Sequence, residues 1–216
     1  MKALYKHIRL VNPGIIQKIM PWITCYGQSP KKNSVYLSFD DGPYRGTTEM
    51  LLEILAVHQV PALFFLRGDR ACSNQNLVQK IHEGGHVIGN HGYSHTSLMF
   101  KPKDLIIEEI ECTNRCITAI TGEPVLYFRP PYGRFDPRFK SIMHDLGMQL
   151  VLWSLLSYDF SRRDNEQVCS TVEKHIRRHS ILVFHDGLPV TAERLKILPY
   201  VIQSVRDAGY SFKHFN

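Results

Sequence analysis

The sequence predicts an α/β fold in which parallel strands alternate with helices. Seven short runs are rich in β-branched and aromatic residues, and a longer helical pattern follows each of the first six. This alternation is typical of a parallel sheet, either an open doubly wound sheet or a barrel. No GxGxxG or Walker loop follows any strand, which removes the usual ligand-binding signature of the open sheet. A length of 216 residues fits one large domain or two small ones.

The expected elements follow one another without a linker of interdomain length. Apolar runs predict strands at Val35–Phe39, Ala62–Leu66, Val87–Asn90, Val125–Phe128, Gln149–Trp153, Ile181–Phe184 and Tyr210–Lys213. Helical spacing of apolar residues predicts helices at Thr47–His58, Asn74–Glu83, Lys103–Thr121, Pro137–Leu146, Asn165–Arg178 and Ala192–Ala208. We therefore expect an N-terminal appendage over residues 1–33 and a single domain over residues 34–216.

The composition is that of an ordinary globular protein. A hydrophobic share of 44% and a charged share of 21% exclude disorder, collagen and coiled coil. The formal charge is +6, but the basic residues occur as scattered doublets without a nucleic-acid-binding module, so we expect no nucleic-acid partner. Five cysteines, an odd number without a CxxC pair, argue against a disulfide framework.

Membrane and targeting signals are weak. No apolar run reaches 18 residues, so we expect no transmembrane helix. Residues 1–24 are basic and apolar, which leaves contact with a membrane surface as an alternative. Without a recognisable signal peptide, and with an odd set of thiols, a cytoplasmic location is favoured, with association with the cell envelope as the alternative. The oligomeric state cannot be read from the sequence.

Polar side chains follow several predicted strands at the point where each strand ends. The first strand runs into Asp40 and Asp41, and adjacent like charges are costly unless a positive group such as a metal ion lies beside them. His91 and His95 follow the third strand, and on a helical turn this spacing would place both imidazoles on one side. With Asp41 they supply two nitrogens and one oxygen, the three-ligand open site of a catalytic zinc.

A competing zinc motif lies just before the third strand. Residues 82–86 satisfy the HExxH pattern of zinc metalloproteases, which requires a continuous helix. Two central glycines cost that helix roughly 2 kcal/mol relative to alanine, and a strand begins directly afterwards at Val87. We therefore interpret Gly84 and Gly85 as the end of a helix.

Further strand ends carry polar groups of the catalytic type. Arg129 follows the fourth strand, where a guanidinium can neutralise a carboxylate, and the backbone N–H of Tyr132 comes after two prolines and suits an oxyanion hole. His185 ends the sixth strand, and Asp159 in the loop after the fifth is placed to orient it as a general acid. In a barrel, polar residues at the C-terminal ends of strands are expected to be functional.

Five segments match a known family in this order: SFDDGP, HGYSH, RPPYG, Trp153–Phe160 and VFHDG. Together they resemble the motifs of the NodB-homology polysaccharide deacetylases, carbohydrate esterase family 4, over about residues 34–215. The resemblance implies a distorted (β/α)7 barrel in a single domain. It also implies a divalent metal, usually zinc, with cobalt or another divalent ion as an alternative, and hydrolysis of N-acetyl or sometimes O-acetyl groups on a carbohydrate.

The resemblance also implies a role for each matching residue. Three would hold the metal: Asp41, His91 and His95. Five would carry the acid–base chemistry: Asp40 as base, Arg129 as its tether, Tyr132 as backbone donor to the oxyanion, and His185 as acid with Asp159 as its partner.

The implied substrate is an acetylated carbohydrate such as a chitooligosaccharide or a peptidoglycan glycan. Two alternatives stay open: a deacylase or deformylase of another amide, for example on a lipid-linked sugar, and a carbohydrate-binding barrel without turnover. Two positions depart from the family pattern, because Leu156 stands where an acid is usual and Phe160 where Trp is usual. Both departures concern the substrate groove, since a Phe ring stacks less extensively on a sugar than Trp does.

Overall fold

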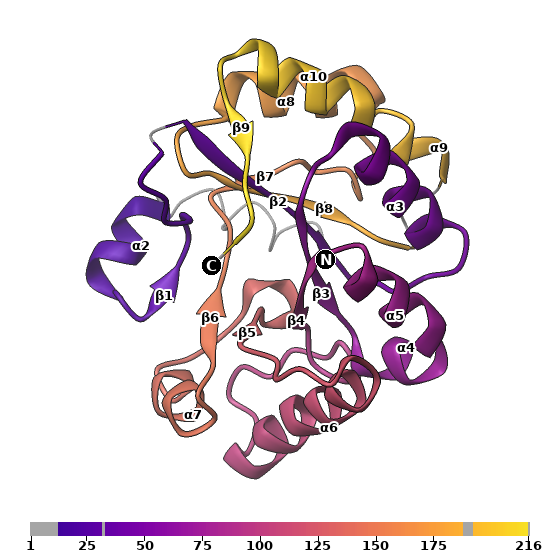
Figure 1. The fold of residues 1–216 in the computed structure, drawn as a ribbon. Helices are drawn as coiled ribbons and strands as arrows, with labels where there is room; N and C mark the ends of the chain where they lie inside the picture. Colours follow the sequence, from indigo (N-terminus) through magenta and orange to yellow (C-terminus); the bar gives the residue numbers. More distant parts are fainter. Residues whose placement is uncertain (1–12, 32, 188–191, 216) are drawn as a thin grey trace.

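The protein folds as one parallel sheet that curls into a barrel, with helices on its outside (Figure 1). A computed structural model describes residues 13–31, 33–187 and 192–215. Within these residues the strand order is β1-β6-β5-β4-β3-β2-β8-β7, with β9 beside β2, and all of these strand pairs are parallel. The predicted α/β class and distorted barrel are confirmed.

The elements have the following bounds. The strands are β1 (Ile23–Thr24), β2 (Ser34–Asp40), β3 (Ala62–Leu66), β4 (Val87–Asn90), β5 (Tyr127–Phe128), β6 (Gln149–Val151), β7 (Leu155–Leu156), β8 (Ile181–His185) and β9 (Ser211–Phe212). The helices are α2 (Pro13–Ile19), α3 (Thr47–His58), α4 (Gly68–Ser73), α5 (Gln75–Glu83), α6 (Lys103–Thr121), α7 (Phe139–Asp145), α8 (Asn165–His175), α9 (Ala192–Leu195) and α10 (Leu198–Asp207), with a short 3-10 helix at Pro131–Gly133.

One stretch of chain joins the two edges of the sheet. β6 lies between β5 and the edge strand β1, and β7 pairs with β8 at the other edge, yet only residues 152–154 separate β6 from β7. At this junction the N–H of Ile181 donates to Oγ of Ser154 at 3.0 Å. The strand predicted at Gln149–Trp153 is therefore divided between two partners. This division is the distortion of the barrel.

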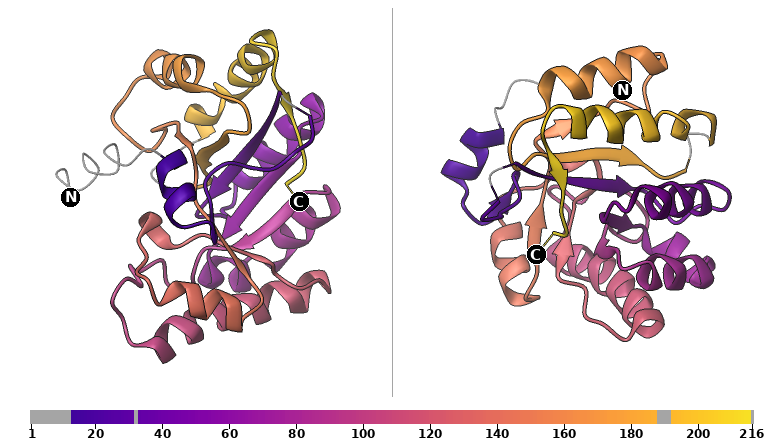
Figure 2. Two further views of the ribbon diagram at one scale, coloured as in Figure 1. Left: turned by 90° about the vertical axis from the view of Figure 1, so that its left-hand side faces the viewer. Right: turned by 45° about the horizontal axis from the view of Figure 1, so that its top comes forward.

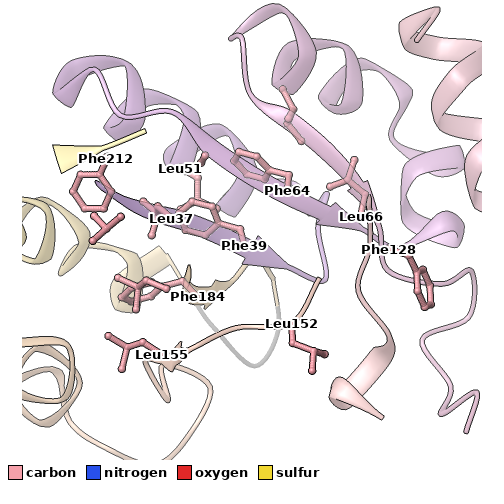
Figure 3. Close-up of a cluster of buried hydrophobic side chains, with 14 of the residues drawn as sticks. Leu37, Phe39, Leu51, Phe64, Leu66, Phe128, Leu152, Leu155, Phe184 and Phe212 are labelled. Carbon is pink, nitrogen blue, oxygen red and sulfur yellow. The ribbon is translucent and has the colours of Figure 1, made fainter. Parts of the chain in front are cut away.

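Every residue of β2 is buried, because one face of this strand packs on helices and the other faces the barrel interior. Leu37 and Phe39 belong to the hydrophobic cluster beneath the helices, together with Leu51 of α3 (Figure 3). The alternate residues point inward, so Tyr36 belongs to a second cluster and Asp40 faces the interior at the end of the strand. The apolar run that predicted this strand thus ends in an inward-facing carboxylate.

The helices pack against one another on the outside of the sheet (Figure 2), with α4 against α6 and α8 against α10. A disulfide joins Cys72 of α4 to Cys116 of α6, a single cross-link and not the framework that the sequence argued against. An odd cysteine count excludes a complete pairing but not a single pair, and Cys25, Cys112 and Cys169 stay as thiols.

Most predicted helices are confirmed, and two of them, Thr47–His58 and Lys103–Thr121, have the predicted bounds. The helix α5 ends at Glu83 and β4 begins at Val87, as the two glycines between them predicted. The prediction of one continuous helix at Ala192–Ala208 was wrong, because the segment forms two helices, α9 and α10. A proline near the start of α10 has no backbone N–H to donate to a preceding turn.

The segment before β2 also contributes to the sheet. β1 pairs with β6, and the side chain of Gln17 in α2 accepts hydrogen bonds from the backbone N–H groups of Cys25 and Tyr26. The domain boundary at residue 33 stays a prediction. Half of the segment considered for membrane contact, residues 1–12, lies outside the described residues. Within the described part of the chain, every helix is too short or too polar to cross a bilayer.

Candidate active site

Asp41, His91 and His95 converge at the carboxyl ends of β2 and β4. Oδ1 of Asp41 lies 2.9 Å from Nε2 of His95 and 3.7 Å from Nε2 of His91. One ligand atom from each residue lies within 4.8 Å of the other two, the only such group of three among the described His, Cys, Asp and Glu side chains. The structure thus brings together the three residues that the sequence singled out as metal ligands.

Asp41 is held by its neighbours in an unusual backbone conformation. Its φ of 77° lies in the left-handed region, which costs a residue other than glycine about 1–3 kcal/mol. Nη1 of Arg70 donates to the Asp41 carbonyl at 2.9 Å, and the N–H of Asp186 donates to the Asp40 carbonyl at 2.8 Å. Gly42 packs so closely on Asp186 that a Cβ there would meet Oδ2 at 2.3 Å. The direction of the Asp41 carboxylate is therefore fixed by the fold.

The two histidines lie in a loop, not on the helical turn that the sequence interpretation considered. Nδ1 of His91 lies 2.7 Å from the carbonyl oxygen of Arg129, which assigns the ring proton to Nδ1 and leaves Nε2 free toward Asp41. A hydrogen bond at the second ring nitrogen is what fixes the orientation of metal-ligating histidines. His95 has a φ of 58°, and this bend turns its ring back toward Asp41.

The histidine loop is anchored to α6 by Glu109, a residue that the sequence interpretation did not single out. Its carboxylate accepts hydrogen bonds from the backbone N–H groups of Tyr93 and Ser94, at 2.8 and 2.9 Å, and from Oγ of Ser94 at 2.6 Å. Asn90 adds a second link, since its side chain donates to the Ile110 carbonyl and accepts from the N–H of the residue after His91. Only the fold brings Glu109 to this loop, because it lies 14 residues after His95.

The charge states of His91 and Asp41 suit a cation. Burial lowers the pKa of His91 to about 4 despite the opposing effect of Asp40 and Asp41, so the ring is neutral and free to ligate at neutral pH. Burial raises the pKa of Asp41, but contact with His95 and the electrostatic effect of the surrounding histidines outweigh it and hold that pKa well below its ordinary value. Oδ1 of Asp41 is buried without a well-aligned hydrogen-bond donor in the described structure. Two imidazoles and one carboxylate with an unsatisfied oxygen fit a divalent metal ion.

Asp40 is held by Arg129, which is buried in the interior of the barrel. Nη1 of the fully buried Arg129 lies 2.6 Å from Oδ1 of Asp40 and donates to Oγ of Ser38 at 3.0 Å. Its other nitrogens donate to backbone carbonyls of the broken β6–β7 strand, and its guanidinium lies 3.9 Å from the ring centroid of Phe65. The predicted pairing of Arg129 with a carboxylate at the strand ends is thus present.

His185 lies opposite Asp40 in the pairing of β8 with β2 and is held by Asp159. Nδ1 of His185 donates to Oδ1 of Asp159 at 2.8 Å, and the His185 backbone N–H donates to Oδ2 at 2.7 Å. Burial lowers the pKa of His185, but the charge and hydrogen bond of Asp159 outweigh it and raise the pKa to about 9. The imidazole is therefore protonated at neutral pH. The ring of Phe160 packs edge-on against it, with centroids 4.8 Å apart.

Tyr132 lies in the short 3-10 helix after β5 and faces the metal-ligand cluster. Its φ is 61°, and its ring centroid lies 4.7 Å from that of His95. Gly133 follows in the same left-handed region, where a Cβ would meet the ring of Trp153 at 2.6 Å. The turn that presents the Tyr132 backbone therefore depends on the residues around it, and it places Tyr132 on the His95 side of the site.

Asp186 is a buried carboxylate to which the sequence interpretation gave no role. Its two oxygens accept hydrogen bonds from Oγ1 of Thr47 at 2.6 Å and of Thr48 at 2.5 Å, at the start of α3. Burial raises the pKa of Asp186 to about 6, although both threonines act in the opposite direction. The pairing connects β8 to the turn after β2. Two sequence features could have indicated this contact: the acid directly after His185, and the two adjacent threonines that follow the first motif.

Comparison with known proteins agrees with this geometry. The family model described as polysaccharide deacetylase matches residues 27–151, more than half of the chain. The chain belongs to the polysaccharide deacetylase family. This family places it among the hydrolases that act on carbon–nitrogen bonds other than peptide bonds. The match includes Asp40, Asp41 and both histidines of the loop, whereas Asp159 and His185 lie beyond it.

Similar proteins share most of the chain. The peptidoglycan-N-acetylmuramic acid deacetylase PdaA of Bacillus subtilis is 30% identical over 87% of this chain and 72% of its own. The solved structure of the peptidoglycan N-acetylglucosamine deacetylase Bc1960 is 27% identical, with a TM-score of 0.85 over 92% of this chain and 93% of its own. A carbohydrate esterase family 4 pseudoenzyme from Bacillus anthracis is 28% identical, with a TM-score of 0.79 over 87% of this chain and 65% of its own.

Proposed function

We propose that this deacetylase-family chain is a metal-dependent hydrolase that removes N-acetyl groups from a glycan, with peptidoglycan strands and chitooligosaccharides as candidate substrates and O-acetyl groups as a further target. The observation that supports the proposal is that three chemical groups lie together at one end of the barrel. A candidate metal cluster, the carboxylate of Asp40 and the imidazole of His185 all lie there. Amide hydrolysis needs an activated water, a base and an acid, and this arrangement supplies groups for all three.

The candidate cation would be held by Asp41, His91 and His95, with zinc favoured over cobalt or another divalent ion. Such a cation, when bound, supplies Lewis acidity that polarises an acyl carbonyl and lowers the pKa of a water molecule. Three protein ligands leave open positions for these groups, as in other catalytic zinc sites.

The protein's own side chains provide the proton transfers. Asp40 accepts the proton of the attacking water, and Arg129 keeps the carboxylate aimed at the site. As the water oxygen bonds to the acyl carbon, the Tyr132 N–H donates a hydrogen bond to the developing oxyanion, which is worth about 3–4 kcal/mol for such a donor. His185 then gives its proton to the sugar nitrogen while the carbon–nitrogen bond breaks. The products are acetate and a free amino sugar.

Two other functions remain candidates. Hydrolysis of another amide, such as a formamide on a lipid-linked sugar, would use the same groups. Glycan binding without turnover would need a barrel that lacks the activity, and one of the solved relatives is described as a pseudoenzyme. In this chain, however, the buried pairs Arg129–Asp40 and Asp159–His185 are both complete. A barrel that only binds a glycan has no need of a buried protonated imidazole opposite a carboxylate, which supports catalysis.

The deciding experiment is acetate release from a panel of peptidoglycan, chitooligosaccharides and acetylated xylan, with zinc-loaded and chelator-treated protein. We expect acetate from at least one N-acetylated glycan and its loss on chelation. Formate or a longer acid from an acylated sugar, with no acetate, would favour the second candidate. Binding of a glycan by zinc-loaded protein without any acid released would favour the third.

A further inference from the structure

Two arginines in loops near the candidate site are each stacked on an aromatic ring. On the side of the metal-ligand cluster, the guanidinium of Arg134 lies 5.6 Å from the ring centroid of Tyr132, whose ring contacts His95. In the loop between β7 and α8, the guanidinium of Arg163 lies 4.2 Å from the ring centroid of Tyr158. We refer to Arg134 and Arg163 as the rim arginines.

Arg163 is connected to the candidate acid through a chain of rings. The ring of Tyr158 lies 6.2 Å from that of Phe160, which packs on His185 at 4.8 Å. Nη1 of Arg163 also donates to Oγ1 of Thr171 in α8 at 2.8 Å, so its guanidinium is held in place. Arg134 is thus separated from His95 by one ring, and Arg163 is separated from His185 by two rings. The reacting amide would bind between these two histidines.

In the described part of the chain, no carboxylate forms an ion pair with either rim arginine. Among the described residues, no Asp or Glu oxygen lies within 4.0 Å of the Arg134 or Arg163 guanidinium. The undescribed residues contain no Asp or Glu at all. Asp164, the acid nearest in sequence, accepts the N–H of Gln167 as the cap of α8.

The acids inside the site have partners of their own. Asp40 pairs with Arg129, and Asp159 pairs with His185. The rim therefore carries positive charge that the protein does not neutralise, on a chain whose net charge is +6.

We propose that the substrate is an anionic amino sugar, with a carboxylate or a phosphate within about one sugar of the acetamido group that reacts. The inference rests on the proposed function and specifies its substrate class. A guanidinium presents parallel donors that match a carboxylate or a phosphate, and stacking on a ring orients it before the ligand arrives. The rings of Tyr132 and Tyr158 would pack on the sugar, and the rim arginines would bind the acid. A neutral chitooligosaccharide would leave both charges without a partner.

The test compares kcat/KM on four glycans of equal length. One is a neutral N-acetylglucosamine oligomer, one is a strand that alternates N-acetylglucosamine and N-acetylmuramic acid, one is this strand with its carboxylates methyl-esterified, and one is an N-acetylglucosamine oligomer with a terminal phosphate. We expect an anionic glycan to exceed the neutral one by about tenfold or more, because a hydrogen bond to a charged group contributes about 1.5–3 kcal/mol. Preference for the muramic acid strand or for the phosphorylated oligomer identifies which acid is recognised.

Arg134→Gln and Arg163→Gln should each reduce the ratio of anionic to neutral kcat/KM by about tenfold, and raised salt should reduce it in the wild type. Arg178→Gln is the matched control, because this exposed arginine precedes β8 at the opposite end of the barrel. Thermal unfolding checks that all three variants are folded. Equal kcat/KM on the anionic, esterified and neutral glycans would overturn the inference, as would equal losses on anionic and neutral substrates in the rim variants.

Equilibrium binding separates this inference from the proposed function. The affinities of the muramic acid strand, its methyl ester and the phosphorylated oligomer are measured by calorimetry with Asp40→Asn protein, with and without Arg134→Gln. If no glycan releases acetate but an anionic glycan binds at least tenfold more tightly than its neutral counterpart, the proposed function fails and the anionic ligand class stands. If acetate is released but charge affects neither rate nor affinity, the proposed function stands and the anionic ligand class fails.

Discussion

Asp40 of β2 and His185 of β8 lie directly opposite each other in the parallel pairing of their strands. Both side chains face the barrel interior where the strands end, and each has a buried partner of opposite charge. Arg129 lies 2.6 Å from Asp40, and Asp159 lies 2.8 Å from His185. Because each group has its own hydrogen-bonded partner, changing one partner should act mainly on the proton-transfer group that it holds.

Asp159→Asn should move the alkaline limb of the pH–rate profile to lower pH. A general acid works only while protonated, so activity falls as pH rises through the pKa of His185, which is raised to about 9. Asparagine removes the negative charge that raises this pKa, and the loss of such a neighbour lowers a pKa by about 1–3 units. The measurement is kcat/KM on an acetylated glycan between pH 5 and 10.

The control for this variant is Asp207→Asn, which removes an exposed acid from α10. It should leave the alkaline limb in place. If the limb of Asp159→Asn coincided with that of the wild type, His185 would not be the acid whose titration limits the rate.

Asp40→Asn and His91→Ala should separate catalysis from metal binding. Asp40→Asn should keep the bound metal and lower kcat by about 10²–10⁴-fold, the usual contribution of a general base. His91→Ala should lose both metal and turnover, because it removes the imidazole whose Nδ1 is fixed by the Arg129 carbonyl. Metal content by elemental analysis and acetate release are measured on the same samples. Normal turnover in Asp40→Asn would assign the base to another group.

Arg129→Met should lower the free energy of unfolding by about 3–5 kcal/mol, because it leaves the buried Asp40 carboxylate without its partner. The double variant Arg129→Met with Asp40→Asn should recover part of this loss, since the uncompensated charge is then gone. Denaturant unfolding measures both. Arg115→Met is the control, because Arg115 pairs with Glu111 on the exposed face of α6 and should change stability little. A double variant no more stable than Arg129→Met would show that packing on Phe65 and not charge is the main loss.

The sequence predicted the barrel strands and the residues at their ends, because both signals are local. The apolar run before Asp40 and Asp41 indicates a buried strand, and the two acids indicate where it ends, all within the seven residues of β2 and the next one. The anchors of the site are different in kind. Glu109 reaches the histidine loop only because α6 packs beside it, and Asp186 meets Thr47 only because β8 pairs with β2. Such contacts depend on tertiary geometry, which hydrophobic periodicity does not encode.

Glu109→Gln should weaken metal binding without lowering the kcat of metal-saturated protein. The Glu109 carboxylate accepts three hydrogen bonds from Tyr93 and Ser94, and a glutamine can offer only one oxygen to these donors. The loop that carries His91 and His95 then loses part of its anchor. Losing such an outer contact typically costs a metal site about 10–100-fold in affinity.

Competition with a chromogenic chelator measures the metal affinity of Glu109→Gln, and acetate release at saturating metal measures its kcat. Glu111→Gln is the matched control, because it changes the same group two residues along α6 at an exposed position. Unchanged affinity in Glu109→Gln would mean that Asn90 and the packing of α4 hold the loop without it. A fall in kcat at saturating metal would instead place Glu109 closer to the reacting groups than its contacts with Tyr93 and Ser94 indicate, since a loop anchor acts on the metal ligands before it acts on the chemistry.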